Sequence, residues 1–178
     1  KELEKKEVST DEVRLTYEWY DYLKVSNASY VRNLNFNKEV NLSDSEIGIC
    51  LSHLKCWRDF YKNNKPGDYA LIVEDDVQFC DNFENKLKFI LDSNWNVKLN
   101  MLYIGYLPDQ WSFDTEDVNE FTYKINNGVW HLSSYIISWE SINALLNKLP
   151  IFGPVDMWIQ LHFKFLYPLA TKKFLCIQ

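Results

Sequence analysis

The 178-residue chain has little positive charge and no long apolar run. Its 25 Asp and Glu outnumber its 19 Lys and Arg, and the cations form neither a tail nor a stripe. Because binding to nucleic acid requires clustered Lys and Arg, we expect no nucleic-acid partner. No apolar run reaches the roughly 18 residues that can cross a bilayer, so we expect no membrane span. The composition suits a soluble protein of the cytoplasm or of a secretory lumen.

Cysteine is also scarce, and its spacing excludes two kinds of site. The four cysteines form no C-x-x-C pair and lie too far apart for a zinc site or a dense disulfide framework. We therefore expect them to be ordinary core thiols. Two glycosylation sequons, at Asn27 and Asn41, matter only if the chain enters a secretory lumen.

Aromatic side chains, by contrast, are abundant, with seven Trp, eleven Tyr and eleven Phe. Such a composition excludes disorder and supports a substantial core, and the length suits a single domain. Apolar residues have helical spacing at 13–23 and again from residue 43 onward. Ser43 and Glu46 have the spacing of a capping box, which predicts that a helix begins there.

Helices and strands are predicted to alternate after residue 43. We expect helices over residues 43–64, 82–91 and 138–149, and another that begins at 153. We expect strands over residues 69–73, 101–104, 121–125 and 129–137, with a polar loop over 108–119. The last two strands are separated by Asn126-Asn127-Gly128, a turn pattern typical of a β-hairpin. The sequence therefore predicts an α/β fold with a mixed sheet flanked by helices.

Three consecutive carboxylates, Glu74, Asp75 and Asp76, directly follow the apolar strand at 69–73, which we expect to be buried. Like charges this close repel one another, so the cluster is tolerable where a divalent cation or a ring of donors balances it. A plain acidic surface turn is the alternative, but the apolar strand immediately before the acids favours a site. Because side chains alternate along an extended strand, we expect Glu74 and Asp76 to face together and Asp75 to face away.

Several stretches, taken together, resemble the family 25 glycosyltransferases, which include lipooligosaccharide and collagen hydroxylysine galactosyltransferases. The first is a glycine-containing helix with Ser-His and an aromatic residue, and the second is an apolar strand that ends in Glu-Asp-Asp. A strand ending in Ile-Gly, a His-containing strand and a Pro-x-Asp element follow in the same order. These stretches are residues 46–57, 71–77, 102–105, 131–138 and 154–156.

The resemblance implies a GT-A fold, a UDP-sugar donor (typically UDP-galactose), a divalent metal and inversion at the anomeric carbon. The metal is expected to be Mn²⁺, and the acceptor to be a glycan, a lipooligosaccharide or a collagen-like hydroxylysine. By similarity, Glu74 and Asp76 take the places of the outer acids of an Asp-x-Asp motif. Asp76 would bind metal and diphosphate, Glu74 would lie nearer the ribose or help hold the metal, and Asp75 would orient its neighbours or touch the sugar.

Four further residues are candidates for the site. The resemblance implies donor binding by Ser52 and His53, although a lone histidine beside an apolar stripe is as often a hydrogen-bonded core residue. His131 is a candidate metal ligand or diphosphate contact. Asp156 is the expected general base for the acceptor hydroxyl, although an acid in the first turn of a helix is also favoured by the helix dipole alone.

Two aromatic residues complete the predictions. Trp111, in the polar loop, is equally a candidate for stacking on a sugar and for a surface anchor. His162 lies in an aromatic stretch and is expected to be structural.

One element of the family pattern is missing from the beginning of the chain. Members usually begin with an apolar strand and an Arg-containing segment that help bind the nucleotide, and nothing in residues 1–40 matches it. We therefore divide the chain into a divergent N-terminal segment, 1–42, and a glycosyltransferase-like domain, 43–178, whose first nucleotide-binding strand is absent or diverged. Two alternatives stay open: a noncatalytic binding or assembly domain of a larger protein, and a metal-dependent phosphoryl-transfer enzyme.

Overall fold

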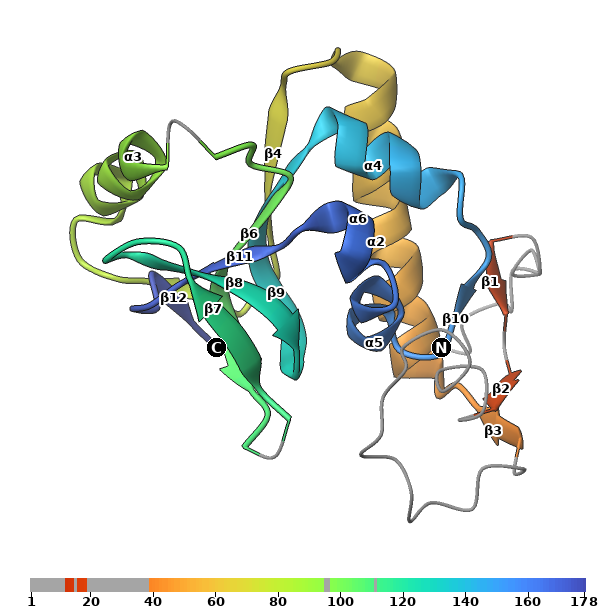
Figure 1. Ribbon diagram of the computed structural model, residues 1–178. Coiled ribbons are helices and arrows are strands. Elements are labelled where there is room, and N and C mark those ends of the chain that lie inside the picture. Colours follow the sequence, from red (N-terminus) through yellow and green to blue (C-terminus); the bar gives the residue numbers. More distant parts are fainter. Residues whose placement is uncertain (1–11, 15, 19–38, 95–96, 111) are drawn as a thin grey trace.

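The computed structural model describes residues 12–14, 16–18, 39–94, 97–110 and 112–178 (Figure 1). Trp111 and Asn27 lie outside this part of the chain. The central sheet is built from β4 (Tyr69–Val73), β6 (Met101–Pro108), β7 (Asp114–Asp117), β8 (Thr122–Asn127), β9 (Val129–Ser138) and β11 (Leu169–Thr171). The strand order is β4-β9-β6-β11-β8-β7. Because β11 runs parallel to β6 while the other neighbours are antiparallel, the predicted mixed sheet is confirmed.

Helices lie on both faces of this sheet (Figure 1). One face carries α2 (Asp44–Asn63), α4 (Trp139–Leu146), α5 (Val155–Gln160) and α6 (Phe163–Leu166). On the other side lies α3 (Phe83–Ser93). Successive residues of a central strand point to opposite faces of the sheet and pack in two separate apolar clusters. Tyr103 packs in the cluster that contains residues of α2, and Leu102 packs in the cluster that contains residues of α3.

The capping box predicted at the start of α2 is confirmed. The Glu46 amide donates to Ser43 Oγ at 3.2 Å, and the Ser43 amide donates to a Glu46 carboxylate oxygen at 2.7 Å. Two of the free amides at the beginning of the helix are thereby satisfied, which fixes where the helix begins. The buried face of α2 is formed by Cys50, His53, Leu54 and Trp57.

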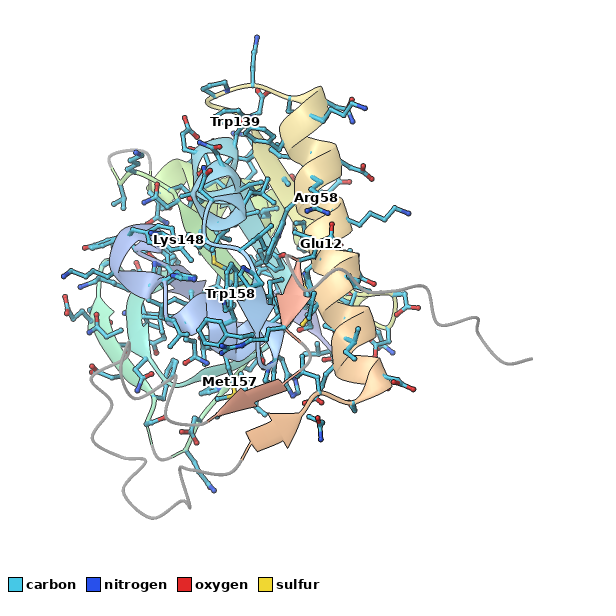
Figure 2. All side chains as sticks on the ribbon, turned by 90° about the vertical axis from the view of Figure 1, so that its right-hand side faces the viewer. Glu12, Arg58, Trp139, Lys148, Met157 and Trp158 are labelled. Carbon is cyan, nitrogen blue, oxygen red and sulfur yellow. The ribbon has the colours of Figure 1, made fainter. Side chains whose placement is uncertain are left out.

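Three short strand pairs join distant parts of the chain. β1 (Val13–Arg14) pairs with β10 (Ile151–Phe152), β2 (Thr16–Glu18) with β3 (Glu39–Asn41), and β5 (Gln78–Phe79) with β12 (Cys176–Ile177). The helix predicted at 13–23 is therefore wrong over its described residues. Val13 is fully buried in the main core, and Glu12 pairs with Arg58 of α2 (Figure 2). The division of the chain at residue 42 stays a prediction.

The hairpin predicted at Asn126-Asn127-Gly128 is wrong. β8 and β9 are consecutive in sequence but not paired, because β8 lies between β11 and β7 whereas β9 lies between β4 and β6. Gly128 does adopt a positive φ of 78°, as the turn pattern requires. The burial of the strands explains the difference: β9 is buried along nearly its whole length and takes an interior position, whereas β8 is only partly buried.

Four smaller expectations also need correction. The loop at 108–119 contains β7, and α4 ends at Leu146 rather than at 149. The strand β4 is buried on one face only, since Tyr69, Leu71 and Val73 are 40–49% exposed. Cys56 is exposed and is therefore not a core thiol. In the part of the chain that the structure describes, no helix has the length and apolar character needed to cross a bilayer.

Candidate active site

The three consecutive acids form a turn at the end of β4. The Glu74 amide donates to the Ser133 carbonyl of β9 at 2.8 Å, which extends the strand pairing by one residue. The chain then turns through Asp75 and Asp76 and enters β5. Because β5 pairs with β12, the segment that follows β12 returns to the acids.

Gln178, directly after β12, connects two of these acids. Its Nε2 lies 2.9 Å from one oxygen of Glu74 and 3.1 Å from each oxygen of Asp76. The two carboxylates therefore converge on one point, as expected, although a turn rather than strand alternation brings them together. Asp75 is exposed and does not line the cavity described next.

A cavity of about 820 Å³ opens in front of the two acids. Its wall contains four carboxylates, those of Glu46, Glu74, Asp76 and Asp156, together with His131. None of the described residues that line it is Lys or Arg. An apolar side of the wall is formed by Ile49, Tyr106, Leu107, Phe174 and Ile177. The cavity is large enough for a small-molecule ligand, and its charge is strongly negative.

Asp156, at the start of α5, accepts hydrogen bonds from two backbone amides, one on β9 and one on α5. Its Oδ2 accepts from the His131 amide at 3.2 Å and its Oδ1 from the Met157 amide at 2.8 Å. His131 has a positive φ of 62°, an uncommon conformation for a residue other than glycine, and this turns its amide toward α5. Since each carboxylate oxygen can accept more than one hydrogen bond, Asp156 retains the capacity to accept a hydrogen bond from a ligand.

The two predicted residues of α2 have different environments. Ser52 is exposed and donates to the Gly48 carbonyl of its own helix at 2.8 Å, and it does not line the cavity. His53 is 4% exposed and lies behind the cavity wall, where its Nδ1 is 2.9 Å from Tyr135 Oη. Its Nε2 is 3.7 Å from Glu74 Oε1. His53 thus contacts the site through Glu74 rather than directly.

The structure therefore gathers four of the predicted residues in one cavity: Glu74, Asp76, His131 and Asp156. Gln178 and the apolar wall residue Phe174 were not predicted. Neither belongs to a sequence motif, and their position depends on the two-residue pairing of β5 with β12. The roles assigned to all these side chains stay predictions.

The fit of a divalent cation can be judged from the donors. Among the described residues, no cluster of three or more His, Cys, Asp or Glu could hold a metal ion, so His131 does not complete a three-ligand set with the acids. Glu74 and Asp76 nevertheless converge within 3.1 Å of a single nitrogen. Two converging carboxylates suit a hard cation that takes its other ligands from water or phosphate.

Two other titratable groups of the wall are neutral at physiological pH. Burial raises the pKa of Tyr106 to about 12, and its hydroxyl donates to the Thr171 carbonyl at 3.0 Å. Burial likewise raises the pKa of the Cys176 thiol above its ordinary value. Neither group is therefore an anionic base in the cavity.

Two comparisons with known proteins show what the chain is similar to. Residues 23–159 match the profile of a family described as glycosyltransferase family 25 (LPS biosynthesis protein). Human procollagen galactosyltransferase 2 is 29% identical over 143 residues, which cover 74% of this chain and 21% of that protein. The chain thus spans about a fifth of the length of this relative.

Proposed function

Since the chain belongs to glycosyltransferase family 25, we propose that it transfers a hexose, galactose in the first instance, from a UDP-sugar to an acceptor hydroxyl with inversion. The proposal includes a GT-A arrangement of the sheet and a divalent metal, Mn²⁺ in the first instance. The human relative is a procollagen galactosyltransferase, which supports galactose as the sugar and a collagen-like acceptor. The family description equally supports a lipooligosaccharide or another glycan.

The charge of the cavity is the main support for the proposed metal dependence. Four carboxylates and no Lys or Arg among its described lining residues would repel a nucleoside diphosphate in the absence of a cation. When bound, a divalent cation would offset the charge on the departing diphosphate. Glu74 and Asp76 are the residues that would hold it, because their oxygens already converge on one donor.

Asp156 is the proposed general base. Its carboxylate lines the same cavity as the paired acids and is oriented by two backbone amides. An inverting transfer needs one base to take the proton of the acceptor hydroxyl as that oxygen attacks the anomeric carbon. His131, next to Asp156, is proposed to contact the diphosphate or the leaving group.

Release of UDP from UDP-galactose and UDP-glucose, with Mn²⁺ and with EDTA, tests this function. We expect Mn²⁺-dependent release that Asp76→Ala abolishes and that Asp81→Ala, an exposed acid outside the cavity, retains. Absence of both turnover and UDP binding would contradict the enzyme and favour a noncatalytic binding domain. Nuclease activity without a sugar donor would favour phosphoryl transfer, which the absence of Lys and Arg from the described cavity wall argues against.

A further inference from the structure

A buried hydrogen-bond chain reaches Glu74 from behind the cavity. Trp57 Nε1 and His53 Nδ1 both lie 2.9 Å from Tyr135 Oη. His53 and Trp57 are four residues apart on α2, so they lie on the same face of the helix. In the pairing of β9 with β4, Tyr135 lies opposite Ile72. Ile72 is two residues before Glu74. His53, Trp57 and Tyr135 are each at most 4% exposed.

Among the described residues, this hydrogen-bond chain has one arrangement of protons in which every donor and acceptor is satisfied. The indole Nε1–H of Trp57 can only donate, so the oxygen of Tyr135 accepts it. The phenol of Tyr135 has one proton of its own, and His53 Nδ1 is the acceptor within reach. Nδ1 of His53 is then without a proton, and the neutral ring has its proton on Nε2.

That proton is directed toward the acids. His53 Nε2 is 3.7 Å from Glu74 Oε1, which is longer than a hydrogen bond but within the range of electrostatic attraction. The other oxygen of Glu74, Oε2, accepts from Gln178 on the cavity side. The carboxylate thus has one oxygen toward the core and one toward the cavity. Contacts of this length often shorten when a ligand binds.

We infer that Tyr135 and Trp57 are positioning residues, which fix His53 as the Nε2–H tautomer and through it hold Glu74 with Oε2 presented to the cavity. Burial supports the donor role of the phenol, since it raises the pKa of Tyr135 well above its ordinary value and keeps the hydroxyl protonated. The assignment of the tautomer stands by itself. The consequence for ligand binding rests on the proposed function, in which Glu74 and Asp76 hold a cation.

The tautomer can be read directly by NMR of the full chain without metal. The chain has only three histidines, so the ring nitrogens of His53 are identified by substituting His131 and His162 in turn. At a pH where His53 is neutral, we expect an unprotonated Nδ1 and a protonated Nε2. A proton on Nδ1 would overturn the inference. Tyr103→Phe serves as the matched control for Tyr135→Phe in the titration described next. Tyr103 is 1% exposed and lies directly opposite Tyr135 in the sheet, but no hydrogen bond joins it to His53.

The effect on the site is tested by calorimetric titration of UDP in the presence of Mn²⁺. Tyr135→Phe is expected to weaken binding by about tenfold or more, as is typical when an outer partner of a metal-binding residue is removed. Tyr103→Phe is expected to bind like the wild type. Equal affinity in Tyr135→Phe and the wild type would overturn the positioning role. A wild-type chain that binds no UDP would instead contradict the proposed function and would leave the tautomer result intact.

Two substitutions of His53 separate hydrogen bonding from packing. His53→Gln retains an N–H near the position of Nε2, whereas His53→Leu fills the space without a donor. We expect His53→Gln to retain most of the UDP affinity and His53→Leu to lose it by about tenfold or more. Equal losses in the two folded variants would show that His53 only packs, and would overturn the inference.

Discussion

The side-chain amide of Gln178 donates to the carboxylate of Asp76, 102 positions away in the sequence, at 3.1 Å. The same nitrogen also reaches Glu74 at 2.9 Å. A neutral donor therefore lies where both carboxylates converge. In the absence of a cation, the Gln178 amide donates hydrogen bonds to both carboxylates. A cation bound at the same place would compete with the amide for the same oxygens.

Removal of this amide is expected to strengthen cation binding. In Gln178→Ala the two carboxylates are no longer bridged, so the affinity for Mn²⁺ should rise by roughly threefold to tenfold, the equivalent of about one net hydrogen bond. Titration of Mn²⁺ followed by electron paramagnetic resonance measures the change. Gln110→Ala, an exposed glutamine outside the cavity, should bind Mn²⁺ like the wild type. Weaker binding in Gln178→Ala would show that Gln178 helps hold the cation instead.

Asp156→Asn is expected to separate chemistry from binding. The amide side chain fits the same space but cannot take the proton of the acceptor hydroxyl, so kcat should fall by about 10²- to 10⁴-fold. UDP binding in the presence of Mn²⁺ should remain, since Glu74 and Asp76 are unchanged. Steady-state kinetics and calorimetry measure the two quantities, with Asp114→Asn on β7 as the matched control. A wild-type kcat in Asp156→Asn would exclude Asp156 as the base.

Two glycines are expected to respond in opposite directions to alanine. A Cβ at Gly105 would collide with Ser134 Oγ and lie 2.9 Å from the Cys176 carbonyl oxygen, so Gly105→Ala should destabilise the fold by about 1–3 kcal/mol. Gly48 is exposed within α2, and apart from its neighbours and the nearby helix backbone no described atom lies within 4 Å of such a Cβ, so Gly48→Ala should stabilise the fold by about 0.5–1 kcal/mol. Urea denaturation measures both. A neutral Gly105→Ala would contradict the close packing of β12 on β6.

Stability is expected to fall in mild acid partly because of His162. Burial, and to a smaller extent the charge of Lys148, lowers its pKa from the ordinary 6.5 to about 4. Between about pH 6.5 and pH 4 the imidazole is protonated in the unfolded chain but not in the folded chain. The free energy of unfolding therefore decreases as the pH falls through this range. His162 packs edge-on against Trp158 with ring centroids 4.6 Å apart (Trp158 and Lys148 are labelled in Figure 2).

Urea denaturation at pH 7 and pH 5 measures this loss. His162→Phe should retain the aromatic contact and lose less stability than the wild type between the two pH values. Lys148→Gln should also reduce the loss, whereas Lys164→Gln should not, since Lys164 does not contribute to the shift. An equal loss in His162→Phe and the wild type would contradict the burial of a neutral imidazole.

The parts of the fold that depend on local chemistry could be predicted from the sequence. Ser43 and Glu46 fix the start of α2 through hydrogen bonds within four residues, and Pro154 and Ser138 similarly precede helices that the structure contains. The pairing of strands could not be predicted in the same way. The turn at Gly128 forms locally, but the partners of β8 and β9 depend on how deeply each whole strand is buried.

In the site, too, features that depend on local sequence could be predicted, whereas contacts between distant residues could not. The acids at 74–76 stand out because three like charges directly follow an apolar strand, and His131 and Asp156, which the sequence also singled out, line the same cavity. Gln178 could not be found, because an amide has no characteristic spacing and β12 has only two residues. The hydrogen bond of Tyr135 to His53 joins residues 82 positions apart, which the sequence alone does not bring together.

In the proposed function, the cavity binds a nucleoside diphosphate through a cation held by Glu74 and Asp76. Calorimetric titration of UDP into the full chain, with Mn²⁺ or with EDTA, tests this claim in the wild type, Asp76→Asn and the control Asp81→Asn. We predict binding to the wild type and Asp81→Asn only when Mn²⁺ is present, and none to Asp76→Asn. Equal binding of UDP in EDTA, or by Asp76→Asn with Mn²⁺, would contradict the claim.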